Sequence, residues 1–466
     1  MAALAQAVTG AGGSISEDIR VCATPYGGRG VYAKKAALGE LARSKAPLAH
    51  IPSSRLITIG AAAQSDIVLD CLAACDEAAM GKDSVALSLL LLTERALDTQ
   101  SEWKWYIDTL PQAGSSGLYF DSTDLAALQP TPLSAAITAK LRQLQHQYAC
   151  FADVLERWKE ENNIGGPVGF DAYKWANFIV LSRAISIQSF LSTPDADTVS
   201  GDFSEFPHAE CDRALLPFLD MFNHSESPTA FWTFKSDGSA MILAGSEPDG
   251  PGIDIDGESF VELHFSYGRN PNTEWLYAHG FLPENNAHDY WPYFPAFGGS
   301  SQMMQIKQKW LHELGISPRI SFADPDNHHK DVLQSDGYSC ETDDYAYDSD
   351  DARSGYVGTT VLLKLCLAFL SDTSDDLRQK VGSVEPKPPG VGVGDALVND
   401  AMELPQIPGL RAFVLEQCIC SLQDVPRAMR ASINMSRKRV INDYLRKEAA
   451  LVERVVGALR QDLSSE

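Results

Sequence analysis

The chain has 466 residues, more than one ordinary hydrophobic core accommodates, and this length predicts two domains. It carries 38 Lys and Arg against 62 Asp and Glu. The resulting formal net charge of −24 argues against a protein that binds the phosphate backbone of nucleic acids and favours a basic protein partner. A merely well-solvated acidic protein is an equally good interpretation of this charge.

The cysteines and the apolar segments indicate where the protein resides. Nine cysteines lack the paired spacing of a disulfide framework or a zinc site. They are Cys22, Cys71, Cys75, Cys150, Cys211, Cys340, Cys366, Cys418 and Cys420. An odd number at irregular spacing favours reduced thiols in a cytoplasmic or nuclear protein. The stretch "MAALAQAVTGAGG" lacks the features of a secretory signal, and the longest aliphatic run, Leu89 to Leu92, is far shorter than the ~20 residues that span a bilayer, so we expect no membrane partner.

The first part of the chain changes from turns to helices. Residues 18–52 are turn-rich, and the glycine cluster of "YGGRGVYA" precedes a predicted strand. From Asp83 the apolar periodicity predicts a helix in "VALSLLLLTERAL" and a second in "SEWKWYIDTLP", which Pro111 ends. Further helices are predicted over 136–161 and from Asp171 through "YKWANFIVLSRAISIQSF".

Strand patterns return after a polar loop at 192–212. The segments "AFWTFKSDGSAMILA" and "SFVELHFSYG" are typical of strands joined by turns of Gly and Asp. The remainder is predicted to be mainly helical, in "QMMQIKQKWLHELG", "GTTVLLKLCLAFL", "LRAFVLEQCICSLQ" and "SRKRVINDYLRKEAALVERVVGALRQDL". An acidic stretch at 324–351 and a linker rich in Pro and Gly at 371–409 lack the composition of a packed core. The pattern predicts a discontinuous α+β unit followed by a helical domain.

Two other kinds of site have weak support in the sequence. The glycines of "PPGVGVGDAL" are typical of a dinucleotide-binding loop, but "SVEPKPP" precedes them instead of an apolar strand, so we interpret the segment as linker. His328 and His329 lie in the acidic stretch without the spacing of a metal site. The segment "DDYAYDSDD" lacks the central Gly and the final Glu of an EF-hand. The sequence therefore predicts no metal site.

Two segments combine polar side chains with an apolar setting. "PFLDMFNHS" places Asp220, Asn223 and His224 within a run of core-forming residues. Buried polar groups without partners cost of order 1–3 kcal/mol each, so these side chains either satisfy one another or hold a ligand. About forty residues later, "HFSYGRNPNTEWLYAHGF" puts Tyr267 directly before Gly268 at the end of a predicted strand, where a phenol projects from a rigid element. Singly, each segment is explained as a turn or a half-buried tyrosine; together with the glycine cluster they favour a functional site.

At these motifs the chain resembles the SET-domain protein methyltransferases of the Rubisco large-subunit methyltransferase type. Four segments carry the resemblance in family order over about residues 20–290: "GRGVYA" with "LGE" nearby, "SEWKWYIDTLP", "WANFIVLSRA" and "LLPFLDMFNHS…FSYGRNPNTEWLYAHGF". It implies an α+β, β-rich, knotted-like SET domain at 18–290 with a helical insert at about 60–165. The residues at 291–466 resemble, more coarsely, that family's all-α substrate-binding domain.

The resemblance also implies the cofactor S-adenosylmethionine and assigns residues by position. Cofactor contacts are expected from Gly28, Arg29, Gly30, Arg183, Asn223, His224 and Tyr267. Substrate contacts are expected from Ser182, Asp220 and His279. Tyr267 is expected to be the catalytic residue beside the transferring methyl group. We expect it to orient the acceptor rather than to act as a base, because a phenol with a pKa near 10 stays mostly protonated at neutral pH.

Two positions depart from the Rubisco-type pattern and bear on the substrate. Ile187 stands where the Rubisco-type enzyme has an arginine, and His279 in "AHGF" stands where many lysine-specific members have Tyr. A histidine-methylating member of the family also lacks Tyr there. We expect a protein-lysine N-methyltransferase that acts on a non-histone protein, such as a ribosomal or translation protein. We expect this substrate protein to be Lys-rich or basic. A protein-histidine N-methyltransferase and a catalytically silent binding module of the same fold are the alternatives.

Overall fold

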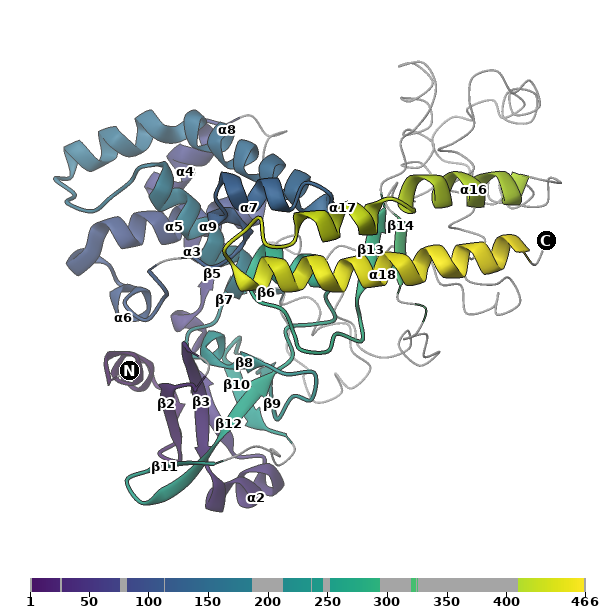
Figure 1. Ribbon diagram of the computed structural model, residues 1–466. Coiled ribbons are helices and arrows are strands. Elements are labelled where there is room, and N and C mark those ends of the chain that lie inside the picture. Colours follow the sequence, from purple (N-terminus) through teal and green to yellow (C-terminus); the bar gives the residue numbers. More distant parts are fainter. Residues whose placement is uncertain are drawn as a thin grey trace, which may run out of the picture. The chain divides into compact units, whose positions relative to one another are not determined.

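The structure is a computed structural model of the chain that forms two compact units (Figure 1). It describes residues 2–186, 213–293, 320–323, 325 and 410–464, apart from 26, 76–81, 113, 236 and 246–251. Of these, the first unit contains 2–119 and 138–269, and the second contains 120–137 and the residues from 270 onward. The predicted domain limits at 18–290 and 291–466 stay predictions.

One sheet of the first unit carries most of the candidate site. Its strands follow the order β11-β12-β3-β2, and β8 pairs with the other part of β12. The strands are β2 (Ile19–Ala23), β3 (Arg29–Lys34), β8 (Asn223–His224), β11 (Ile253–Ile255) and β12 (Glu258–Phe265). All pairs are antiparallel except β8 with β12, which is parallel. Because side chains alternate along a strand, Val261, Leu263 and Phe265 enter the core while Glu262 and His264 lie on the opposite face.

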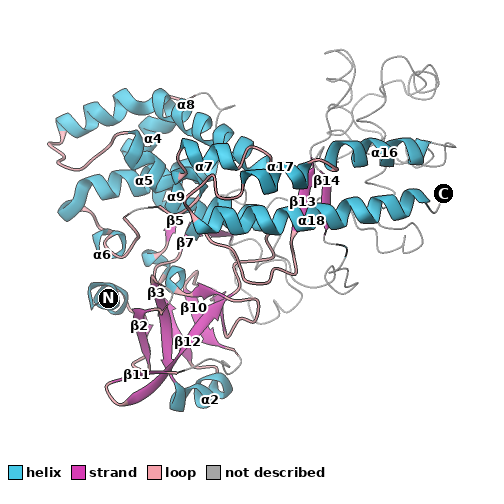
Figure 2. Cartoon of the chain, in the orientation of Figure 1, coloured by secondary structure: helices cyan, strands magenta, loops and turns pink. Residues whose placement is uncertain are grey.

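Two further sheets complete the β part of the first unit (Figure 2). One has the order β1-β4-β10-β9, with β1 (Ser14–Ile15), β4 (Pro47–Ile51), β9 (Ala230–Phe234) and β10 (Ala240–Ala244). The other has the order β5-β7-β6, with β5 (Ile57–Thr58), β6 (Ile185–Ser186) and β7 (Arg213–Leu215). Strands β9 and β10 form the antiparallel hairpin that the alternation in "AFWTFKSDGSAMILA" predicts.

The helical part of the first unit has its own core. It contains α3 (Ile59–Ala62), α4 (Asp66–Ala73), α5 (Lys82–Leu97), α6 (Lys104–Ile107), α9 (Phe170–Arg183) and the larger part of α8 (Pro132–Glu161). Helix α9 is buried on nearly every side, and it packs against α5. Asp171 in its first turn and Arg183 in its last turn complement the helix dipole. Helix α9 thus ends with Arg183 at the candidate site.

Several predicted elements differ in extent. The stretch at 18–52, predicted to be turn-rich, contains helix α2 (Lys35–Ser44), and an unpredicted helix α1 (Ala2–Gly10) precedes it. The segment "SEWKWYIDTLP" forms only the short α6, since the hydroxyl of Ser101 bonds the backbone N–H of Trp103 and begins the helix late. The helix predicted from Asp171 ends at Arg183, because the chain turns extended at Ala184 and pairs as β6 with β7.

The described residues of the second unit lie mainly in helices. These helices are α7 (Ser122–Ala127), α11 (Asn272–Glu274), α16 (Leu410–Leu422), α17 (Val425–Ser432) and α18 (Arg439–Ser464), with a π-helical turn at Trp275–His279. A two-stranded antiparallel sheet of β13 (Tyr290–Tyr293) and β14 (Ile320–Ala323) accompanies them, which the sequence did not indicate. The predicted linker at 371–409, nearly all of the acidic stretch at 324–351 and two predicted helices between residues 301 and 370 lie outside the described residues.

Candidate active site

The segment from Pro217 to Ser225 forms a strained turn followed by a short strand. Phe218 has φ 77° and ψ −42°, a conformation that side-chain-bearing residues rarely adopt, and its ring is buried against Phe222. A 3₁₀ turn over Leu219–Met221 follows, and then β8. Apolar side chains of this segment thus anchor it in the core, as the sequence indicated. Its polar side chains make hydrogen bonds to other segments.

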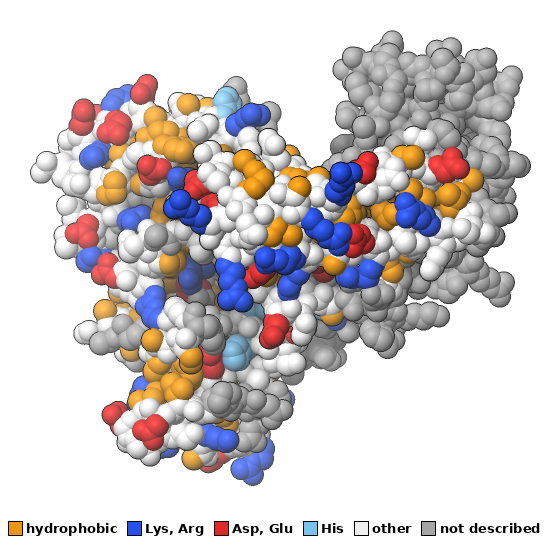
Figure 3. Space-filling model, viewed as in Figure 1, with side chains coloured by type: hydrophobic (Ala, Val, Ile, Leu, Met, Phe, Trp, Pro, Cys, Tyr) orange, Lys and Arg blue, Asp and Glu red, His pale blue; other side chains and the backbone are white. Residues whose placement is uncertain are grey.

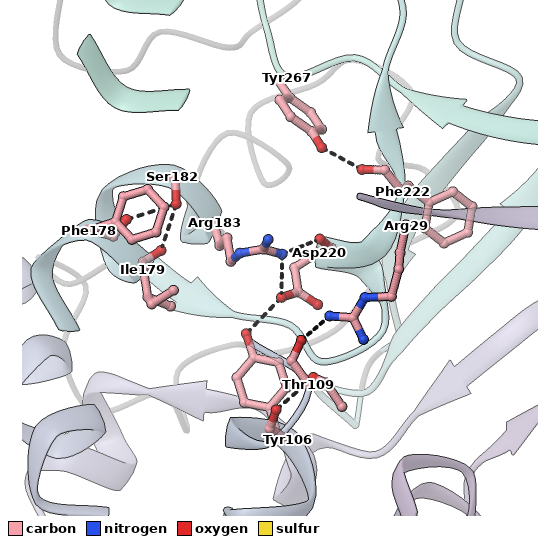
Figure 4. Close-up of polar contacts among 10 residues, drawn as sticks. All are labelled: Arg29, Tyr106, Thr109, Phe178, Ile179, Ser182, Arg183, Asp220, Phe222 and Tyr267. Atoms are coloured by element: carbon pink, nitrogen blue, oxygen red, sulfur yellow. Dashed lines mark hydrogen bonds and ion pairs between the residues drawn. The ribbon is translucent and has the colours of Figure 1, made fainter. Parts of the chain in front are cut away.

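Asp220 lies at the centre of a buried polar network (Figure 4). Arg183 donates from Nη1 to the Asp220 backbone oxygen at 2.6 Å and to Oδ2 at 3.0 Å, and the hydroxyl of Tyr106 donates to the same Oδ2 at 3.0 Å. The Asp220 side chain is 1% exposed and that of Arg183 is 26% exposed. Among the described residues, Asp220 Oδ1 and Arg183 Nε have no hydrogen-bond partner, although both atoms are buried. The network therefore retains one acceptor and one donor for a ligand.

Two groups of this network, Arg183 and Tyr106, keep one protonation state at neutral pH. Burial lowers the pKa of the Arg183 guanidinium, but the Asp220 carboxylate and the phenols of Tyr106 and Tyr267 together outweigh this effect, and the pKa is raised. Burial, with the nearby Asp220 charge, raises the pKa of the Tyr106 phenol well above its ordinary value. Arg183 is therefore a permanent cation and Tyr106 a permanent hydrogen-bond donor.

Tyr267 follows strand β12 and is held through both its backbone and its phenol. Its hydroxyl donates to the backbone oxygen of Phe222 at 2.5 Å, and its N–H donates to His224 Nδ1 at 3.1 Å. Gly268 adopts φ 95°, which allows the chain to turn directly after it. Burial raises the pKa of Tyr267 to about 12, with opposite contributions from Arg183 and Asp220. The phenol is therefore a neutral donor, which suits an orienting role and not that of a base.

The contact with Tyr267 also fixes the tautomer of His224. Because His224 Nδ1 accepts the N–H of Tyr267, a neutral imidazole carries its proton on Nε2. The two rings lie 5.4 Å apart between centroids. His224 thus has a defined ring orientation.

The glycine-containing turn lies against the same strands. Gly28 adopts φ 79° and has open space where a side chain would project, whereas Arg29 donates to the backbone oxygen of Thr109. Asn223 donates from Nδ2 to the Arg29 backbone oxygen at 3.0 Å and to Glu262 Oε1 at 2.7 Å. Both N–H groups of this amide are thereby used within the protein, and the backbone of Asn223 pairs with β12, which leaves the side-chain oxygen for other contacts.

Two of the predicted substrate contacts have other described neighbours. The hydroxyl of Ser182 donates to the backbone oxygen of Phe178 at 2.8 Å in its own helix (Figure 4), so its polar group is satisfied there. His279 belongs to the second unit, where its ring lies 5.2 Å from that of Trp275 in the π-helical turn. Ile187 lies outside the described residues.

Three residues of the site were not singled out from the sequence. Tyr106 and Thr109 lie in "SEWKWYIDTLP", and Glu262 interrupts the apolar alternation of "SFVELHF". The first segment was recognised as a motif without a role for its side chains. A carboxylate in the middle of a strand was a signal that could have identified Glu262, since charged residues are seldom buried without partners.

Two features of the described residues bear on other site types. No group of three or more His, Cys, Asp or Glu side chains is arranged to hold a metal ion in the part of the chain that the structure describes. Within the same residues no helix has the length and apolar character needed to cross a bilayer.

Comparison with known proteins gives relatives by sequence. No family model matches the chain. The actin-histidine N-methyltransferase of Xenopus tropicalis is 27% identical over 276 residues, and that of Homo sapiens is 26% identical over 276 residues. Each alignment covers 59% of this chain and 42% of the relative, so the chain matches less than half of the length of these proteins.

The solved structures that resemble the chain extend over nearly all of it. The SET domain of LSMT bound to lysine and AdoHcy has a TM-score of 0.65 at 15% identity, covering 98% of this chain and 90% of that structure. Rubisco LSMT bound to AdoMet has a TM-score of 0.64 at 15% identity, covering 99% and 92%. The chain therefore has the SET-domain fold of the Rubisco LSMT structures, as the sequence resemblance predicts.

Proposed function

We propose that the chain is a protein N-methyltransferase that uses S-adenosylmethionine. The observation that carries the proposal is the meeting of the glycine turn, the Asn223–His224 strand and the neutral phenol of Tyr267 in one unit of SET-domain fold. The LSMT structures of this fold are titled as bound to AdoMet or AdoHcy, and the curated relatives are named as N-methyltransferases.

The residues present suit this cofactor. S-adenosylmethionine supplies a methyl group on a positively charged sulfur. The unpartnered buried Oδ1 of Asp220 favours a nearby cation, and the open space at Gly28 leaves room for a ligand against the backbone. We assign cofactor binding to Gly28, Arg29, Gly30, Arg183, Asn223, His224 and Tyr267. Arg183 acts there mainly through Asp220, whose carboxylate it holds in place.

The chain's part in the reaction is alignment. The neutral hydroxyl of Tyr267 donates its proton to the Phe222 backbone oxygen and keeps its own oxygen as an acceptor, and we assign to it the orientation of the acceptor nitrogen. Fixing two reactants in a productive geometry and excluding water can supply several kcal/mol of the barrier. Tyr267 is on this proposal the catalytic residue, with Asp220 as a substrate contact.

The acceptor that we propose first is a lysine of a non-histone protein, such as a ribosomal or translation protein. A similar structure is titled as bound to lysine. With an ordinary pKa of ~10.4, neutralising a lysine at pH 7 costs about 4–5 kcal/mol. Desolvation in a closed channel and a nearby positive charge both lower a lysine pKa and offset this cost. A basic character of the substrate and a cytoplasmic or nuclear location remain part of the proposal.

A histidine acceptor is the second candidate, because the curated relatives are named as actin-histidine N-methyltransferases. In addition, His279 stands where many lysine-specific members of the family have Tyr. A histidine with a pKa of ~6.5 is mostly neutral at pH 7 and needs orientation but no neutralisation.

The test is transfer of a radiolabelled methyl group from S-adenosylmethionine into proteins of a cell extract. We expect the wild type to label proteins. The rate of methyl transfer by Tyr267→Phe should be at least about tenfold lower, since this variant lacks only the O–H. Amino-acid analysis of the labelled product separates methyl-lysine from methyl-histidine. Equal labelling by both enzymes contradicts the role of Tyr267, and a wild type that binds no cofactor in calorimetry supports the silent binding module instead.

A further inference from the structure

We propose that Glu262 is a positioning residue, which fixes the strand that carries the predicted cofactor contacts. Glu262 lies on β12, and no role was assigned to it above. The inference rests on the proposed function, because cofactor binding is its readout. Three described contacts of its carboxylate carry the argument.

The first contact holds Asn223. Its Nδ2 donates to Glu262 Oε1 at 2.7 Å and to the backbone oxygen of Arg29 at 3.0 Å. One amide therefore ties β8 to the glycine turn and to β12 at once. Of these two acceptors only the Glu262 carboxylate is a charged group, and hydrogen bonds to charged groups are stronger than those between neutral groups.

The second contact follows from the register of the sheet. Glu262 lies directly opposite Tyr32 in the pairing of β12 with β3, so the two side chains share a face. The Tyr32 hydroxyl donates to Glu262 Oε2 at 3.3 Å. Burial, together with the Glu262 charge, raises the pKa of Tyr32 to about 12, so this donor keeps its proton. Each carboxylate oxygen of Glu262 thus has a donor, and the side chain has a defined orientation.

The third feature is the space that Gly30 leaves. A Cβ at residue 30 would lie 2.3 Å from Glu262 Oε1, so the carboxylate would have to move from its position, and 3.0 Å from Asn223 Nδ2, which is a tight contact. Gly30 has no positive φ, so backbone freedom does not explain the residue. The glycine in "GRG" therefore admits the carboxylate and the amide side by side.

His264 completes the surroundings on the same face of β12. Its Nε2 lies 3.8 Å from Glu262 Oε1, and the parallel pairing of β12 with β8 sets His264 opposite Asn223. The next pair in this register is Phe265 with His224. A displacement of Asn223 is thereby passed to His224, which meets the N–H of Tyr267. Glu262 acts on the site through Asn223 and not by direct contact with a ligand.

The experiment compares Glu262→Ala and Glu262→Gln with Glu258→Ala as the matched control. Glu258 lies on the same strand and pairs with Lys34, but its side chain is 49% exposed. Calorimetry with S-adenosylmethionine gives the affinity, thermal unfolding gives the stability, and methyl-transfer assays separate kcat from the KM of the cofactor.

We expect Glu262→Ala to weaken cofactor affinity about tenfold and to raise the KM of the cofactor more than it lowers kcat, as loss of one buried hydrogen-bond partner requires. Glu262→Gln, which keeps an acceptor for Asn223, should recover most of the affinity, and Glu258→Ala should remain within about twofold of the wild type. If Glu262→Ala does not fold, Glu262→Gln is compared with the wild type instead, by kcat and by the KM of the cofactor.

Two outcomes overturn the inference alone. One is an unchanged affinity of folded Glu262→Ala with a lowered melting temperature, which makes the residue purely structural. The other is an equal loss in Glu258→Ala. A wild-type chain that binds no S-adenosylmethionine overturns the proposed function, and the inference with it.

Discussion

Asp220 is the residue on which the site depends most directly. It accepts bonds from Arg183 and Tyr106, which come from helices α9 and α6, so one carboxylate connects three segments of the first unit. A buried ion pair with a spare acceptor is costly as a purely structural device, because desolvation offsets much of its attraction. The spare Oδ1 therefore supports the proposal that Asp220 contacts a ligand.

We expect Asp220→Asn to lower the free energy of unfolding by about 1–3 kcal/mol, because Arg183 loses its counter-charge in a buried setting. Chemical denaturation monitored by circular dichroism measures this. Asp108→Asn is the control, since Asp108 pairs with Lys104 at the surface and should change stability by less than about 0.5 kcal/mol. Equal effects of the two variants would contradict the buried role of Asp220.

At this scale the sequence located residues but not their partners. The motifs led to Arg183, Asp220, Asn223, His224 and Tyr267, which the structure brings together in the first unit. The partners of these residues stand far away in the chain: Tyr106 is 114 residues from Asp220, and Glu262 is 39 residues from Asn223. No local pattern encodes such pairs, because side-chain contacts across a fold depend on its topology.

At the scale of elements, helix α18 shows how a secondary-structure element can carry a titrating group in its core. Glu448 on its buried side is fully buried in the second unit, close to the carboxylate of Asp289. Burial, together with the Asp289 charge, raises the pKa of Glu448 well above its ordinary value. Glu448 therefore keeps its proton to a higher pH in the folded protein than in the unfolded chain.

This difference makes the stability of the second unit depend on pH. A carboxyl group whose pKa is higher in the folded than in the unfolded protein lowers the free energy of unfolding as the pH rises. The loss begins above the pKa of the group in the unfolded chain, which is near 4.5. We expect Glu448→Gln to raise the melting temperature at pH 7–8 and to flatten its decline with pH. Differential scanning calorimetry between pH 5 and 8 measures both effects. Glu453→Gln is the control on the same helix, because Glu453 lies half-exposed in a pair with Arg430, and an equal gain there would contradict the explanation.

The periodicity of the sequence predicted elements well where burial is regular. It gave α5, α8, most of α9 and the β9–β10 hairpin, whose apolar patterns are long and uniform. It missed α2, in which Gly39 and a short amphipathic pattern resemble a turn. It overextended the third predicted helix beyond Arg183, where strand pairing with β7 outweighs helix propensity.

At the scale of the whole molecule, the net charge is the property that bears on the choice of partner. The net charge of −24 produces a negative potential around much of the protein, although Figure 3 shows Lys and Arg side chains gathered on one visible face over α17 and α18. A long-range negative field speeds the encounter with a basic partner and has little effect on a neutral one.

We expect kcat/KM for a Lys-rich acceptor peptide to fall several-fold between about 0.05 M and about 0.3 M salt, since screening shortens the range of the field. A neutral acceptor peptide of the same length should change by less than about twofold. Steady-state methyl-transfer assays measure both. A salt response that is the same for the two peptides would remove the support that net charge gives to a basic substrate.

The strained backbone at Phe218 affects how the site segment tolerates substitution. Its φ of 77° favours glycine, whereas its buried ring, 1% exposed and packed on Phe222, requires an aromatic side chain. Glycine at this position relieves the backbone but leaves a cavity, and any other residue keeps the strain and loses the packing. Position 218 is thus constrained by two opposing demands. In a saturation library it should accept fewer replacements than its equally buried neighbours, although its side chain touches no reacting group.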